Sequence, residues 1–216
     1  MIVPPSFLFQ YQLSVPRIDG LPKKKGQSLK LPDAARIFVP ARMNEGAAAL
    51  DIRLAWNPNG LALELSVHEK TAEPSGRRSD LKHSDHILVL IDTRHTANVH
   101  RATEFCTALQ ILPADEAEND QPTVQFVEIG QQRNTRLDQN AKRVDVVVET
   151  VSDGYRMDVW IPAAQIPGFA ESPEIGHIGF YVLVEDTELG QLPLSIGDDF
   201  PVAYNPSTWL QLNLSS

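Results

Sequence analysis

Short apolar runs closed by turn residues recur along the whole chain, and this pattern most constrains the fold. Asp153-Gly154 separates the runs Val144–Val151 and Tyr155–Ile161, and Asp-Gly between alternating apolar residues is a strong signal of a β-hairpin. The run Ile87–Ile91 is apolar at every position, which is typical of a strand that is buried on both faces at the centre of a sheet. Such strands with turns between them favour two packed sheets over a helical fold.

The pattern predicts about ten strands and no long helix. We expect strands at Phe7–Leu13, Ile37–Val39, Leu50–Trp56, Leu61–Glu69, Ile87–Ile91, Thr103–Leu112, Thr123–Ile129, Val144–Val151, Tyr155–Ile161, Gly176–Asp186 and Thr208–Leu214. With 216 residues, 42% of them hydrophobic, the chain is large enough to bury the core of a single domain over residues 1–216. We therefore predict an all-β fold, a two-sheet antiparallel β-sandwich of the immunoglobulin-like or jelly-roll type.

The composition excludes several classes of partner. A formal net charge of −9 argues against nucleic-acid binding, which needs a coherent basic surface. No run approaches the roughly 18 apolar residues of a membrane span, and the first sixteen residues lack the basic and apolar regions of a signal peptide. The single cysteine, Cys106, excludes an internal disulfide and is compatible with a reducing compartment. The oligomeric state stays open.

The first candidate site lies on one face of the predicted Asp-Gly hairpin. If the turn has two residues, Glu149 stands directly opposite Asp158 in the ladder, with Trp160 and Arg156 on the same face. Facing carboxylates repel each other unless a positive charge or a ligand neutralises them. One alternative is a solvated face on which Arg156 pairs with the carboxylates. The other is a bound cation or a polyol, whose CH groups stack on the indole while carboxylates accept from its hydroxyls.

The second candidate site is the polar connector that follows the buried run. It holds Asp92, Arg94, His95, His100 and Arg101 within ten residues. The two arginines have the donors to bind an anion or a sugar, whereas guanidinium groups make a poor neighbour for a metal ion. The remaining alternative is an ordered loop whose side chains cap its own backbone.

Several short motifs fall in a familiar order over residues 16–214. They are Ile18-Asp19-Gly20, Ala55-Trp56, Gly60-Leu61-Ala62-Leu63, Ser84-Asp85, Asp92, Met157-Asp158-Val159-Trp160-Ile161-Pro162, Gly179-Phe180 and Asp186. In this order the chain resembles the family 9 carbohydrate-binding modules and the wider set of DOMON-like sandwiches. The resemblance implies a β-sandwich whose members bind sugar ends, haem or no known ligand.

The resemblance also implies residue roles. Its sugar-binding members clamp a ring between two tryptophans, for which Trp160 is a candidate, and they hold structural calcium through loop carboxylates. The calcium candidates by this analogy are Asp85, Asp92 and Asp186. No other cofactor is expected, because the predicted register turns Met157 into the core and away from the haem-ligating role that the resemblance would give it.

Two hypotheses follow for the function. The first is a non-catalytic module that binds a carbohydrate or a similar polyol. The second is a structural or protein-interaction β-sandwich domain without a small-molecule ligand. An enzyme has no support, because no nucleophile elbow, phosphate-binding loop or dinucleotide fingerprint is present and Cys106 is expected to be a buried, inert thiol.

Overall fold

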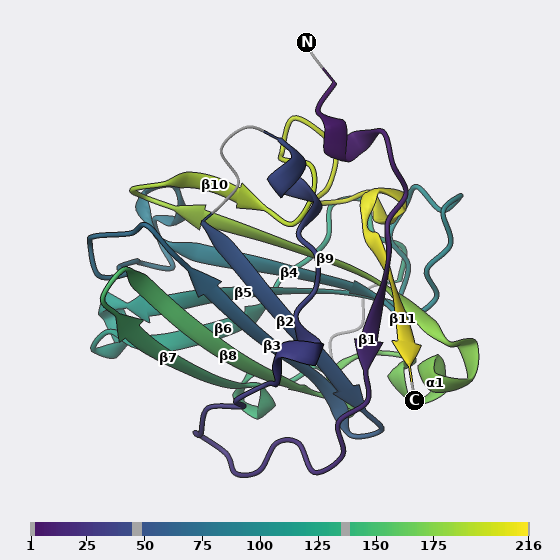
Figure 1. Ribbon diagram of the computed structural model, residues 1–216, viewed down its shortest axis with the longest axis horizontal. Helices are drawn as coiled ribbons and strands as arrows, with labels where there is room; N and C mark the ends of the chain where they lie inside the picture. Colours follow the sequence, from purple (N-terminus) through teal and green to yellow (C-terminus); the bar gives the residue numbers. More distant parts are fainter. Residues whose placement is uncertain (1–2, 45–48, 135–138, 216) are drawn as a thin grey trace.

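The computed structural model describes residues 3–44, 49–134 and 139–215, and in these ranges the chain forms eleven strands and one short α-helix (Figure 1). The strands are β1 Gln12–Pro16, β2 Leu50–Asn57, β3 Gly60–Val67, β4 His86–Asp92, β5 Cys106–Asp115, β6 Gln121–Phe126, β7 Asp145–Val151, β8 Gly154–Pro162, β9 His177–Asp186, β10 Gly190–Pro193 and β11 Leu210–Ser215. The α-helix is α1 Ser172–Ile175. The 3-10 turns are Pro5–Phe7, Asp33–Ala35, Pro40–Met43, Leu81–His83, Glu116–Glu118, Ala141–Arg143, Ala163–Gln165, Phe169–Glu171 and Pro206–Thr208. No helix within these ranges is long and apolar enough to cross a membrane.

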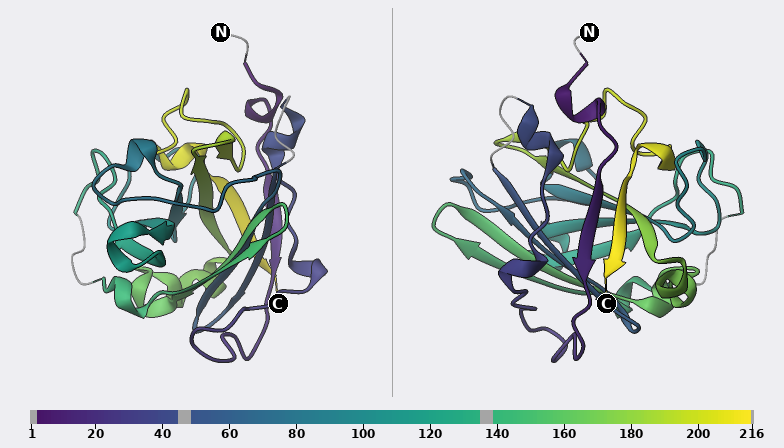
Figure 2. Two further views of the ribbon diagram at one scale, coloured as in Figure 1. Left: turned by 90° about the vertical axis from the view of Figure 1, so that its left-hand side faces the viewer. Right: turned by 45° about the vertical axis from the view of Figure 1, so that its right-hand side comes forward.

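The strands form two sheets that pack on each other (Figure 2). The larger sheet has seven strands in the order β1-β11-β9-β4-β5-β6, with β10 also paired to β9, and the smaller has the order β2-β3-β8-β7. The predicted all-β sandwich is confirmed. The larger sheet is mixed rather than antiparallel, because β1 pairs in parallel with β11. These two strands come from opposite ends of the chain, so no turn signal between them could reveal the pairing.

The core lies between the sheets and follows the predicted alternation. Leu61, Leu63 and Leu65 of β3 are fully buried against residues of the opposite sheet. Strand β4 lies between β9 and β5, which confirms the prediction of a central strand from its continuous apolar run.

A second apolar cluster lies on the outer face of the smaller sheet. Residues 18–35, here called the strap, run across this face (Figure 1). The cluster joins strap residues to small residues and one indole of the sheet: Leu21, Leu29, Leu31, Ala35, Ala55, Ala62 and Trp160. The Gly26 amide donates to Asp145 Oδ2 at 2.6 Å, and the Leu31 amide donates to Glu64 Oε2 at 3.1 Å. The sheet carboxylates therefore fasten the strap by its backbone.

The β7–β8 hairpin differs from the predicted register by two residues. Gly154 already belongs to β8 and pairs with the last residue of β7, so Glu149 lies opposite Arg156 and not opposite Asp158. A shift of two leaves every side chain on the expected face. The predicted pair of like charges is wrong, and an ion pair between Arg156 and Glu149 takes its place.

The reason for the shift is a close approach between strands. A Cβ on Gly154, where φ is +148°, would lie 2.0 Å from the Val67 carbonyl oxygen of β3. The glycine is therefore required inside the ladder, where β8 meets β3, and the turn is made by the two residues before it.

Three further elements depart from the prediction. The alternating residues Phe7–Leu13 begin in a 3-10 turn and continue as an irregular segment, and only the end of the range enters β1. Ile37–Val39 is extended beside β2, with the Ile37 amide donating to the Ile52 carbonyl, but forms no strand. The short β10 was not expected, since it lies in a turn-rich region with little alternation.

Candidate functional site

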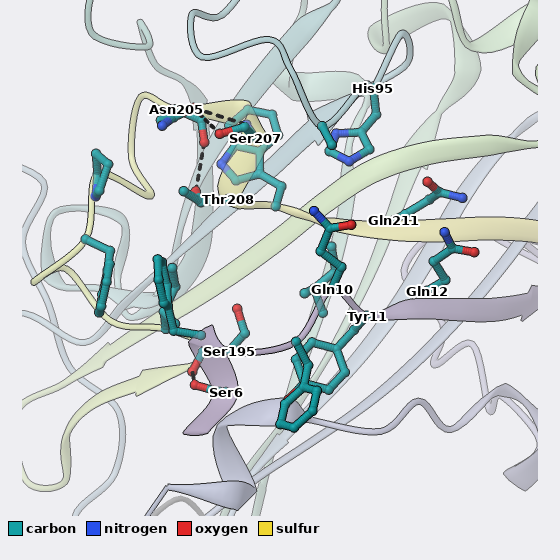
Figure 3. Close-up of a pocket in the computed structure, with 18 of the residues that line it drawn as sticks. Ser6, Gln10, Tyr11, Gln12, His95, Ser195, Asn205, Ser207, Thr208 and Gln211 are labelled. Atoms are coloured by element: carbon teal, nitrogen blue, oxygen red, sulfur yellow. Dashed lines mark hydrogen bonds between the residues drawn. The ribbon is translucent and has the colours of Figure 1, made fainter. Parts of the chain in front are cut away.

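A cavity of about 410 Å3 opens where three distant segments meet (Figure 3). Its walls come from residues 6–12 before and within β1, residues 95–100 of the connector after β4, and residues 195–211 leading into β11. The parallel pairing of β1 with β11 brings the first and last of these segments together. Ser6 fastens the N-terminal segment, because its hydroxyl donates to the Ser195 carbonyl at 3.1 Å.

One wall of the cavity is aromatic. The rings of Phe7 and Phe200 stack with centroids 4.6 Å apart and planes at 23°. Trp209 also lines the cavity; it is buried, and its Nε1 donates to the Val202 carbonyl at 2.8 Å. Phe7 stays 47% exposed, so the stack presents an apolar face to solvent.

The cavity is also lined by amide and imidazole groups. Figure 3 shows His95, Gln10 and Gln211 among them. His100 also lines the cavity, with its Nδ1 2.9 Å from the Ser207 hydroxyl. No acidic or basic side chain other than histidine is found among the described residues that line the cavity.

The His95 imidazole packs on Gly179 of β9, which has no side chain. A Cβ on Gly179 of β9 would lie 2.5 Å from His95 Nδ1, so only glycine lets the imidazole pack on the strand. The side chain is buried, and Nδ1 has no hydrogen-bond partner among the described residues. Burial, with a smaller contribution from His177, lowers the pKa of His95 to about 4. The imidazole is therefore neutral at physiological pH.

The predicted site on the β7–β8 face is covered. Trp160 is 6% exposed and Asp158 3%, because the strap packs over both, and desolvation raises the pKa of the Asp158 carboxyl. The expectation of a polar-aromatic patch facing solvent is thus wrong. Glu149 and Arg156 remain partly exposed and pair with each other.

The connector residues divide between two places. His95 and His100 reach the cavity. Arg94 stacks on Phe105 with 4.7 Å from its guanidinium carbon to the ring centroid, and it pairs with Glu171 at 3.2 Å. Arg101 donates through Nε to the Gln131 carbonyl. The two arginines therefore do not converge on one anion.

The carboxylates predicted to hold calcium are also separated. Asp85 and Asp186 meet at one end of β4, where Lys70 Nζ lies 3.3 Å from Asp85 Oδ2 and 3.0 Å from Asp186 Oδ1, and all three side chains are fully buried. Asp92 lies at the other end of β4 and accepts from the Arg94 amide at 2.9 Å. No cluster of three or more metal-binding side chains occurs among the described residues. The ammonium of Lys70 supplies the positive charge that the resemblance would assign to a metal.

Cys106 is buried, as expected. Burial, reinforced by the nearby Asp92 carboxylate, raises the pKa of the thiol to about 12. A thiol that stays protonated and inaccessible does not act as a nucleophile.

Sequence reasoning missed the aromatic wall. The strand predicted over Phe7–Leu13 gives Phe7 no role in a site, and no sequence pattern singles out Phe200 or Asn205. The available signal was the density of aromatic residues near the N-terminus, which exceeds what one core face needs.

The fold defines a class. It is the β-sandwich fold of solved family 9 carbohydrate-binding modules, so the predicted resemblance to that family is confirmed for the fold. A family 9 carbohydrate-binding module from Caldicellulosiruptor kristjanssonii, in complex with cellotriose, has a TM-score of 0.59 at 15% identity over 95% of this chain and 94% of that chain. The module in complex with glucose gives 0.61 at 15% identity over 95% and 96%.

A third structure extends the likeness of fold. A crystal structure of a protein from Bacteroides uniformis ATCC 8492 has a TM-score of 0.55 at 12% identity over 94% of this chain and 99% of that chain. No protein-family model and no curated protein matches the sequence.

Proposed function

We propose that residues 1–216 are one non-catalytic carbohydrate-binding module that holds a sugar in the cavity between residues 6–12, 95–100 and 195–211. The observation that carries the proposal is the stacked Phe7–Phe200 pair in a cavity that is also lined by imidazole, amide and hydroxyl groups and by no Asp, Glu, Lys or Arg among the described residues. Sugar rings present apolar CH faces that stack on aromatic rings and a rim of hydroxyls that both donate and accept. The module of the same fold from C. kristjanssonii was solved with glucose and with cellotriose, which supports this ligand class.

The composition of the cavity also supports a binding role without catalysis. Glycoside hydrolysis uses a pair of carboxyl groups across the scissile bond. Neither Asp nor Glu lines the cavity among the described residues. Cys106, the one thiol of the chain, is buried outside it.

Isothermal titration calorimetry with glucose and cellotriose tests the proposal. Phe7→Ala removes one ring of the stack and should weaken binding about two- to tenfold, because aromatic stacking contributes about 0.5–1.5 kcal/mol. Phe38→Ala is the matched control, because Phe38 is 49% exposed, close to the 47% of Phe7, and does not line the cavity. Absence of any heat with the folded wild type, or equal losses in both variants, would refute the proposal.

A second candidate function rests on exposed apolar side chains beside the cavity. Leu8, Phe9 and Phe38 are 67%, 57% and 49% exposed, and the Tyr11 ring centroid lies 6.2 Å from those of both Phe9 and Phe38. Exposed apolar patches are typical of protein contacts. This favours the alternative of a protein-interaction domain. Light scattering would support it if the wild type forms a concentration-dependent dimer that Phe38→Asp abolishes, and a strictly monomeric wild type counts against self-association.

A further inference from the structure

A row of polar residues leads out of the cavity along the larger sheet. The register places Gln12 of β1 beside Gln211 of β11, and Gln211 beside Gly179 of β9, on which His95 packs. Two residues further along, Ser14 lies beside Asn213, and Asn213 beside His177. We call Gln12, Ser14, Gln211, Asn213 and His177 the polar track.

The track lies on the outer face of the sheet. Directly paired residues of neighbouring strands project to the same side. Gln211 and Asn213 of β11 also share a side, since the Gln211 side chain donates to Asn213 Oδ1 at 2.8 Å. The alternating neighbours Val15, Leu212 and Ile178 are fully buried in the core. The polar side chains therefore face away from the core, and Gln12 and Ser14 are exposed.

The cavity and the track are continuous. Gln12 and Gln211 line the cavity and also begin the track, whereas Ser14, Asn213 and His177 lie beyond the cavity. From Gln10 to Ser14 an extended chain covers about 13 Å at roughly 3.3 Å per residue. The polar surface is thus longer than the aromatic stack that marks one sugar position.

The side chains of the polar track share one property, which is the lack of a carboxylate, ammonium or guanidinium group. The track offers amides, a hydroxyl and an imidazole, and none of its five members is Asp, Glu, Lys or Arg, in a chain that is 22% charged. Amides both donate and accept, so they match the hydroxyls of a neutral sugar. A polysaccharide that carries carboxylates or sulfates calls for arginine or lysine, which the track lacks.

We infer that the site takes a neutral oligosaccharide chain, with one unit stacked in the cavity on Phe7 and Phe200 and the following units along the track. This inference rests on the proposed function and adds the length and the charge of the ligand. Asn213 then determines affinity for chains and not for single sugars. A net hydrogen bond to each further unit raises the affinity roughly two- to tenfold.

Calorimetry with glucose, cellotriose, cellohexaose and an oligogalacturonide of six units tests the inference on the full chain. We expect the affinity to rise with length among the neutral ligands, and Asn213→Ala to weaken cellohexaose two- to tenfold while glucose binds as before. Ser14→Val is a second variant, since valine favours a strand at this exposed position and removes the hydroxyl. Gln27→Ala, an exposed amide on the strap, is the control.

The outcomes separate the two proposals. Equal affinity for glucose and cellohexaose, an Asn213→Ala loss of the same size for both, or tighter binding of the oligogalacturonide overturns the inference and leaves the proposed function standing. Failure of the folded wild type to bind any of the four ligands overturns both.

Discussion

Replacing Lys70 with methionine is the sharpest perturbation of stability that the structure offers. The Lys70 ammonium lies 3.3 Å from Asp85 Oδ2 and 3.0 Å from Asp186 Oδ1, with all three side chains fully buried. The remaining partners of the carboxylates are mostly backbone amides, such as that of Thr187, which donates to Asp85 Oδ1 at 2.7 Å. Methionine keeps an unbranched apolar side chain close to the length of the lysine stem and removes the ammonium, so two buried carboxylates are left without a cation.

The expected cost is large. Removing one partner of a buried ion pair costs about 3–5 kcal/mol, because the other charge stays desolvated and unpaired. Here one ammonium serves two carboxylates, which places the estimate toward the upper end, at about 4–5 kcal/mol. With a urea m-value of about 2 kcal/mol/M, the unfolding midpoint should fall by about 2 M.

Urea unfolding followed by tryptophan fluorescence measures the effect, and Tyr155→Phe is its control in the same buried region. The Tyr155 hydroxyl is buried without a partner among the described residues, and burial, with Asp186 and Asp85 nearby, raises the pKa of the phenol. Removing an unpaired buried hydroxyl should leave the midpoint unchanged or raise it. A Lys70→Met protein within about 1 kcal/mol of wild type would refute the reasoning.

Three further predictions concern charge. A chelator should leave the unfolding midpoint of the wild type unchanged, because Lys70 is the cation that pairs with both buried carboxylates. A drop in the midpoint that calcium reverses would contradict this. The folded pKa of His95, about 4, lies below its unfolded value near 6.5. The wild type should therefore lose stability relative to His95→Gln as the pH falls from about 6.5 toward 4, with no change above that window. A difference in unfolding free energy that does not depend on pH would count against this prediction. Glu149→Gln should change the free energy of unfolding by less than about 1 kcal/mol, because the ion pair of Glu149 with Arg156 is solvent-exposed. A loss of several kcal/mol in urea unfolding would contradict this prediction.

The alternation of apolar residues was enough to predict the sandwich and its core. Leu61, Leu63 and Leu65 alternate with smaller or polar residues, and the continuous run of β4 identified the centre of the larger sheet. These signals are local, since strand periodicity is set by the pleat of the backbone.

The register of the β7–β8 hairpin depended on a contact that no local pattern carries. Asp153-Gly154 is typical of a turn, yet Gly154 is needed where β8 approaches Val67 of β3. The competing tertiary requirement moved the pairing by two residues and placed Arg156 against Glu149.

The candidate site was only partly predictable for a similar reason. His95 and His100 were identified from the density of polar residues in one connector. The cover over Trp160 comes from the strap, in which isolated apolar residues such as Leu29 stand among lysines, prolines and glycines that favour an exposed loop. The aromatic wall joins Phe7 to Phe200, nearly the full length of the chain apart, through a parallel pairing that sequence patterns do not reveal.

A crystal structure of the protein grown with cellotriose addresses the central claim most directly. The account places the sugar against the stacked rings of Phe7 and Phe200, within reach of His95, while Trp160 stays beneath the strap. Density for the trisaccharide on an uncovered Trp160, with the cavity beside Phe7 empty, would contradict it.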